Sequence, residues 1–219
     1  GEVEDGEAEV HDHGDAKGVG DAMLMGLYQL STQGKTNVAA LAGVKVPTGK
    51  DDVEDGGTKL ETEFQPGSGA WDFLAGLAVT HKFNNKSIDA NVLYSLTGEG
   101  NQDTDLGDAF SFNASYSFRF SGVEEEGAHS DEENPSPHAH IYWDAIVELN
   151  GEWRDKIDID GEKSKNSGGT IAYLAPGLRV SSTSGWGAFL SVGIPIVEDS
   201  NGEQTDTEAK ISAGFSIGL

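Results

Sequence analysis

A strict alternation of apolar and polar residues is the feature that most constrains the fold of this chain. In "DAFSFNASYSFRF", residues 108–120, every even position from Phe110 to Phe120 is apolar or aromatic, and Ser, Asn or Arg fills the odd positions between them. Side chains of a β-strand point alternately to its two faces, so this stretch predicts a strand with one apolar and one polar face. The aromatic face would meet a second sheet in a soluble sandwich, and lipid in a membrane barrel.

The same period recurs along the chain, in segments separated by turn residues. Asn150-Gly151 is a hairpin signal, yet the alternation continues through it, so we predict one long strand there and not a turn. No segment has convincing helical spacing. The nine predicted strands cover residues 19–31, 36–47, 70–83, 87–97, 108–120, 140–157, 169–181, 185–197 and 205–219.

The composition of the two faces favours a barrel over a sandwich. The polar faces are rich in Ser, Gly, Asn and Thr, small residues that suit a crowded barrel interior. Aromatic residues near both ends of the apolar faces resemble the girdles of outer-membrane barrels. Short connections alternate with long polar ones, except that the long segment 121–139 falls on the short-turn side. We therefore predict an all-β fold, an antiparallel up-and-down transmembrane β-barrel.

The predicted strand count sets an expectation about the rest of the barrel. Bacterial single-chain barrels have an even number of strands, so nine strands predict that others lie upstream. We expect the chain to be the C-terminal part of a longer barrel of about 12 strands. Residues 1–17 are acidic and aperiodic and predict a loop or disordered segment, and residues 18–219 form the barrel part.

Charge and composition exclude several classes of protein. The 219 residues include 30 glycines and no cysteine, and they carry a formal net charge of −24. This acidic excess argues against nucleic-acid binding, which needs Lys and Arg, and fits either a cation-attracting surface or adaptation to salt. An apolar run of about 18 residues is absent, so no transmembrane helix is expected. Barrel strands need only about 9–11 residues and remain compatible with this composition.

Six short, Gly-rich stretches occur in order between residue 18 and about residue 204. They are GVGDAMLMGLYQL, VKVPTGKDD, GSGAWDFLAGLAVTHKF, ELNGEW, NSGGTIAYLAPGLRV and WGAFLSVGIPIVEDSNGEQ. Together they resemble the outer-membrane family labelled "meta-pathway of phenol degradation", which is described as a transporter family. The resemblance implies a β-barrel in a Gram-negative outer membrane, made with a signal peptide and further N-terminal strands. Leu219 departs from the usual pattern, in which the last strand ends in an aromatic residue.

The polar faces supply the working surface of the first functional hypothesis, a channel or transporter for small solutes. Mixed charges across a narrow lumen set ion preference, and carboxylates outnumber bases between residues 140 and 157, which indicates a preference for cations. The alternative is a structural or partner-binding envelope barrel whose lumen is plugged by pairing of these charges. The predicted lumen-lining residues are Asp72, Asp89, Asn91, Asn113, Arg119, Asp144, Glu148, Asn150, Glu152, Arg154, Arg179 and Lys210. The predicted lipid-facing residues are Phe73, Phe110, Phe112, Tyr116, Phe118, Trp143, Trp153 and Trp186.

Histidines in acidic segments are the first candidate metal ligands. His11 and His13 lie in the acidic N-terminal segment, and His138 and His140 flank another acidic stretch. Imidazole combined with carboxylate suits Zn²⁺, Cu²⁺ or Ni²⁺. The spacing defines no known site, so solvated surface histidines are the simpler interpretation.

Two acidic turns are the second candidate. Asp158 and Asp160 in "DIDGE", and Asp199 and Asn201 in "DSNGE", place oxygen ligands at alternate positions. This is the opening of a calcium loop without its distal bidentate Glu, and turn chemistry explains the same residues equally well. We expect no dedicated cofactor and at most loosely bound Ca²⁺ or other divalent cations.

Catalytic motifs are missing from the sequence. No G-x-S-x-G motif appears, and His81 falls on the apolar face of its predicted strand, so we expect no enzyme. The expected location is the outer membrane of a Gram-negative bacterium. The expected partners are outer-membrane lipid and lipopolysaccharide, the N-terminal remainder of the barrel, and a periplasmic or envelope protein.

Overall fold

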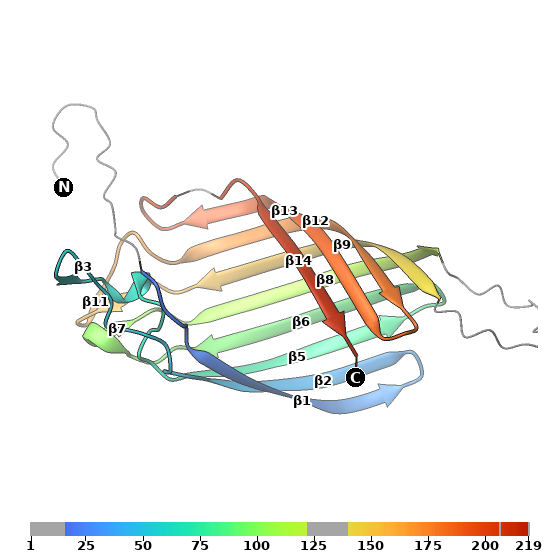
Figure 1. Cartoon of the computed structure of the whole chain (residues 1–219), viewed down its shortest axis with the longest axis horizontal. Helices are drawn as coiled ribbons and strands as arrows, with labels where there is room; N and C mark the ends of the chain where they lie inside the picture. Colours follow the sequence, from blue (N-terminus) through green and yellow to red (C-terminus); the bar gives the residue numbers. More distant parts are fainter. Residues whose placement is uncertain (1–15, 122–139, 206, 219) are drawn as a thin grey trace, which may run out of the picture.

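One antiparallel sheet of nine long strands dominates the computed structural model, which describes residues 16–121, 140–205 and 207–218 (Figure 1). The strands pair in chain order, each antiparallel to the next, so the sheet is an up-and-down meander with β1 (Ala22–Gln33) and β14 (Lys210–Ile217) at its two edges. The predicted all-β antiparallel fold is confirmed. The long strands are β1 (Ala22–Gln33), β2 (Thr36–Val46), β5 (Asp72–Lys82), β6 (Lys86–Leu96), β8 (Ala109–Ser121), β9 (Ile141–Arg154), β12 (Gly169–Ser182), β13 (Trp186–Ser200) and β14 (Lys210–Ile217).

The predicted strand positions are confirmed with small shifts at their ends. The largest difference is at β14, which begins at Lys210 and not at residue 205. Strand β9 continues through Asn150-Gly151, as the alternation predicts. The Phe112 ring of β8 covers Gly151 so closely that a Cβ there would collide with it. An aromatic ring across a strand glycine supports pairing there, and the hairpin signal is overridden.

The two faces of the sheet differ in burial. In β5, Asp72 and Leu74 are 8% and 6% exposed, whereas Phe73 between them is 59% exposed. The same alternation recurs in much of β6, β8, β9, β12 and β13, with large apolar side chains on the exposed face, whereas the edge strand β1 is exposed along nearly its whole length. Few apolar residues of the described part are buried, and most are alanine: Val53, Ala70, Leu74, Ala109, Ala172 and Ala175. The apolar face is therefore not the inside of a conventional hydrophobic core.

Connections of unequal length distinguish the two ends of the sheet (Figure 1). The turn end, on the right in Figure 1, carries the short connections 34–35, 83–85 and 183–185, and the end of β8 and the start of β9 also lie there. Residues 122–139, between these two strands, lie outside the described part, as do residues 1–15. The loop end carries the long connections 47–71, 97–108, 155–168 and 201–209.

Short strands pair different connections of the loop end with one another. Strand β7 (Thr104–Asp105), in the connection from β6 to β8, pairs with β10 (Asp158–Ile159), in the connection from β9 to β12. No helix within the described ranges is long and apolar enough to cross a membrane. The small elements are β3 (Glu54–Asp55), β4 (Thr58–Lys59), η1 (Thr62–Phe64), η2 (Asn101–Asp103), β7 (Thr104–Asp105), β10 (Asp158–Ile159) and β11 (Glu162–Lys163).

Candidate functional site

Strand register brings the predicted polar residues onto one face of the sheet, called here the inner face. Paired residues of adjacent strands share a face, so Asn113 lies beside Asn91 and Asn150, and Asp144 lies between Arg119 and Arg179. Following the pairs across the sheet places all twelve residues predicted to line a lumen on the inner face. The eight residues predicted to face lipid share the opposite, outer face, and Phe112 and Trp186 are the half-buried members of that set.

The turn-end cluster consists of Arg119, Asp144 and Arg179, from β8, β9 and β12. Arg119 donates from Nε to Asp144 Oδ1 at 2.9 Å, and Arg179 donates from Nε to Oδ2 at 3.0 Å. The carboxylate is buried, at 2% exposure, whereas both guanidinium side chains remain partly exposed. The Arg119 guanidinium also lies over the Tyr142 ring, 4.4 Å from its centroid. Two positive charges around one negative charge leave the cluster with a formal charge of +1.

A cavity of about 360 Å³ lies against this cluster. Its lining includes residues Phe83, Asn84 and Asn85 of the β5–β6 turn and reaches from β5 across to β12. Three basic and two acidic side chains of the inner face line it: Lys82, Arg119, Arg179, Asp89 and Asp144. Lys86 also borders the cavity, but its side chain lies on the outer face, with Nζ 5.9 Å from the Phe118 ring centroid. This pocket is locally positive in a chain whose formal net charge is −24.

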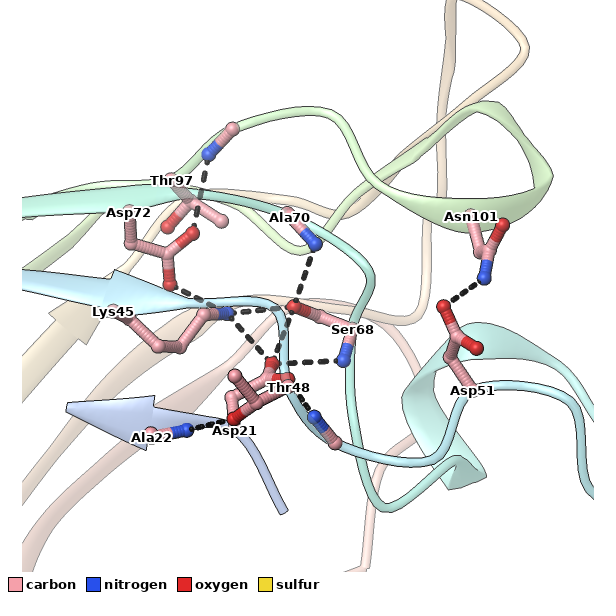
Figure 2. Close-up of polar contacts among 12 residues, drawn as sticks. Asp21, Ala22, Lys45, Thr48, Asp51, Ser68, Ala70, Asp72, Thr97 and Asn101 are labelled. Atoms are coloured by element: carbon pink, nitrogen blue, oxygen red, sulfur yellow. Dashed lines mark hydrogen bonds and ion pairs between the residues drawn. The ribbon is translucent and has the colours of Figure 1, made fainter.

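The loop-end cluster consists of Asp21, Lys45, Ser68 and Asp72 (Figure 2). The Lys45 Nζ lies 2.7 Å from Asp72 Oδ2 and 3.5 Å from Asp21 Oδ2, and it donates to Ser68 Oγ at 2.6 Å. Lys45 and Asp72 are direct partners in the β2–β5 pairing. Two acids surround one base here, so the formal charge of this cluster is −1.

Hydrogen bonds satisfy Asp21 within the loop-end cluster. Gly49 N donates to Oδ1 at 2.9 Å, and Ser68 N and Oγ donate to Oδ2 at 3.0 and 2.9 Å. Burial alone raises the pKa of Asp21, but these hydrogen bonds and the Lys45 charge outweigh it and hold the pKa below its ordinary value. Asp21 therefore anchors the 47–71 connection to the start of β1.

Two glycines let the loop-end segments approach closely. A Cβ on Gly49 would lie 2.6 Å from Gly67 Cα, and one on Gly67 would lie 2.7 Å from Gly49 Cα, so neither position has room for a side chain. Gly49 comes from "VKVPTGKDD" and Gly67 from "GSGAWDF", which meet "GVGDAM" here. Three of the Gly-rich stretches thus gather at one structural junction.

A family model matches residues 2–194 and is described as "Putative MetA-pathway of phenol degradation". The chain belongs to this family. The match agrees with the resemblance of the six stretches, and it covers the turn-end and loop-end clusters. A search of curated proteins finds no match.

Other inner-face charges of this family member are partly paired. Arg154 Nη2 lies 3.0 Å from Glu152 Oε1, and Ser111 donates to Glu152 Oε2 at 3.2 Å. Lys210 Nζ lies 5.8 Å from the Tyr173 ring centroid. Glu148 makes no side-chain hydrogen bond or ion pair with a described residue. Glu148 thus differs from Asp144, which lies on the same strand and is fully engaged.

The predicted metal ligands are not brought together in the described part of the chain. Asp160 occupies the tight β10–β11 turn with φ of 58°, and the Asn201 amide donates to Ser167 O. Asp158 lies in β10, Asp199 lies near the end of β13, and the His140 backbone N donates to Thr183 Oγ1. No group of three or more His, Cys, Asp or Glu within the described residues is arranged to hold a metal. The remaining candidates, His11, His13 and His138, lie outside the described residues.

Sequence reasoning missed much of the loop-end cluster. Lys45 carried a usable signal, because it stands between Val44 and Val46 in an alternating strand and so belongs to the polar face. Asp21 and Ser68 precede strands, where no periodicity indicates their orientation. Their contacts with Lys45 arise from the fold alone.

Proposed function

We propose that this chain forms the wall of an outer-membrane β-barrel through which small solutes pass. The observation that carries this proposal is the inverted burial: most aromatic side chains lie on an exposed face, and the opposite face carries mainly small or polar ones. An exposed apolar surface that spans nine strands marks contact with an apolar phase, because monomeric soluble proteins rarely present one so large. Lipid is the occupant that suits a sheet of this shape.

Aromatic positions near both ends of the outer face support a membrane setting. Phe110 and Trp153 lie toward the loop end, and Phe120 and Trp143 lie toward the turn end. All four are exposed, at 38–52%. Aromatic residues at these two levels match the interface girdles of transmembrane barrels. The long strands of the sheet have 8–15 residues, which is about the length that a tilted strand needs to cross a bilayer.

The polar inner face supports a passage. It carries charged groups at both ends and a cavity at the turn end. A cation preference stays a prediction. Glu148 favours it, because this carboxylate has no described partner. Two observations weigh against it: Glu152 is paired with Arg154, and basic side chains outnumber acidic ones in the turn-end cavity. The bridging of Arg119 and Arg179 by Asp144 favours the second candidate, a structural barrel whose lumen is filled by paired charges.

The membrane setting can be tested with tryptophan fluorescence. The chain has four tryptophans, Trp71, Trp143, Trp153 and Trp186, and three of them are 39–53% exposed. We expect brominated lipid in reconstituted vesicles to quench their emission strongly and water-soluble acrylamide to quench it weakly. Strong acrylamide quenching without quenching by brominated lipid would contradict the proposal.

Passage can be tested by single-channel recording on the natural full-length protein in a planar bilayer under a salt gradient. We expect discrete current steps, and the reversal potential reports the ion preference. Glu148→Gln should reduce any cation preference, since it removes an inner-face charge without a described partner. Glu63→Gln, in the loop-end element η1, serves as a control. Silence from protein shown to be folded by heat-modifiable mobility would support the filled barrel instead.

A further inference from the structure

The turn-end cavity has the charge of an anion site. Three basic side chains and two acidic ones of the inner face line it, an excess of one positive charge in a strongly acidic chain. The acidic members are already engaged: Asp144 binds both arginines, and Asp89 accepts from Thr80 Oγ1 at 2.6 Å and Ser87 Oγ at 3.0 Å. The positive excess therefore remains for a ligand.

Hydrogen-bond donors remain available in the same place. A guanidinium group has five N–H donors, and Arg119 and Arg179 each direct only Nε and Nη2 at Asp144. Lys82 makes no side-chain hydrogen bond or ion pair with any described residue, and it lines the same cavity. Both arginines are 36–43% exposed at the side chain, so their remaining donors are accessible.

The arginines are also held in place. Asp144 fixes both guanidinium groups from the middle one of three paired strands, and the Tyr142 ring supports that of Arg119. Donors fixed on rigid strands lose little entropy when a ligand binds. A planar guanidinium fork matches the geometry of a carboxylate.

We propose that this cavity binds a small organic carboxylate. Its volume, about 360 Å³, falls within the range of small-molecule sites. Asn84 and Asn85 add amide groups, which can hydrogen-bond to the organic part of such a ligand. This inference deepens the proposed function and rests on it for the site's role in selecting solutes, but binding itself can be measured without a current.

The test is ligand-observed saturation-transfer NMR on the full-length protein in detergent, with succinate as the probe. We expect a signal from succinate and none from succinamide, its neutral analogue. Lys82→Gln should weaken succinate binding about tenfold, since it removes one charge-assisted contact and touches no described partner. The double variant Lys82→Gln/Arg119→Gln should abolish the signal. Lys50→Gln, which removes an equal charge at the exposed loop end, should bind like the unaltered protein.

Several results would contradict the carboxylate site. Equal binding by Lys82→Gln and Lys50→Gln, or equal signals from succinate and succinamide, would overturn the inference. Displacement of succinate by equimolar phosphate would overturn the preference for a carboxylate. Succinate binding by a protein that shows no channel currents would support the carboxylate site and refute the proposed passage of solutes. Channel currents without succinate binding would support the passage and refute the site.

Discussion

The turn-end and loop-end clusters use the same chemistry in opposite proportions. At the turn end, two arginines surround one aspartate, and at the loop end, two aspartates surround one lysine. Both join neighbouring strands through buried carboxylates on the inner face. Their formal charges, +1 and −1, differ in sign.

The difference lies in the groups that each cluster leaves unsatisfied. Asp21 accepts from two backbone N–H groups and one hydroxyl, and Lys45 contacts three oxygen atoms, so the loop-end cluster is closed on itself. Arg119 and Arg179 retain donors that face a cavity. A closed ion cluster anchors a loop, whereas an open one can bind a ligand.

Breaking the turn-end cluster should have the largest effect. Asp144→Ala leaves two arginines without their shared carboxylate on the inner face, and we expect the free energy of unfolding to fall by about 2–4 kcal/mol. Urea unfolding in detergent, followed by tryptophan emission, measures it. Glu148→Ala on the same strand is the control and should change stability by less than about 1 kcal/mol. Equal losses in the two variants would show that Asp144 is not a structural bridge.

Removing the base of the loop-end cluster should have the next largest effect. Lys45→Met leaves Asp21 and Asp72 facing each other, and we expect a loss of about 1–3 kcal/mol. Hydrogen exchange at Gly49 N and Ser68 N should accelerate, because both donate to Asp21. Lys50→Met, an exposed lysine in the same connection, should leave exchange unchanged. Unaltered protection in Lys45→Met would remove the anchoring role.

The stabilisation that Asp21 gives to the loop-end cluster should be lost in acid. The pKa of Asp21 is lowered in the folded chain and ordinary in the unfolded chain, so the unfolded state takes up the proton first as the pH falls. Its stabilisation is complete above the ordinary carboxyl pKa, about 4, and is lost as the pH falls through the folded pKa. Unfolding midpoints between about pH 6 and pH 2 should show this loss, and Asp21→Asn should lack it. If the midpoints of the unaltered protein and of Asp21→Asn fall in parallel with pH, Asp21 is not the source of the acid sensitivity.

An exposed ion pair sets the smallest expected effect. Lys163 Nζ lies 2.7 Å from Asp155 Oδ2 at the loop end, but both side chains are about half exposed to water. Solvent screens such pairs, so Lys163→Gln should leave the unfolding midpoint unchanged within error. If Lys163→Gln loses as much stability as Lys45→Met, burial does not explain why one ion pair stabilises the fold more than the other.

The strands and their faces could be predicted from the sequence because both depend on a local period. Alternation identified β9 across Asn150-Gly151 despite a hairpin signal, and it assigned the Phe112 and Trp153 side chains to the outer face. Side chains of an extended chain alternate whatever the partner strand is, so this information needs no knowledge of the partner.

The sequence by itself determined which residues of each strand face inward and which face outward, and it contains the stretches that resemble the family. The tertiary structure decided which of these residues contact one another. Arg119, Asp144 and Arg179 were each assigned to the polar face, but their contact depends on the register of three strands. Asp21 and Ser68 reach Lys45 only because a long connection folds back on the sheet. Register and loop closure arise from contacts between distant segments, which no local period encodes.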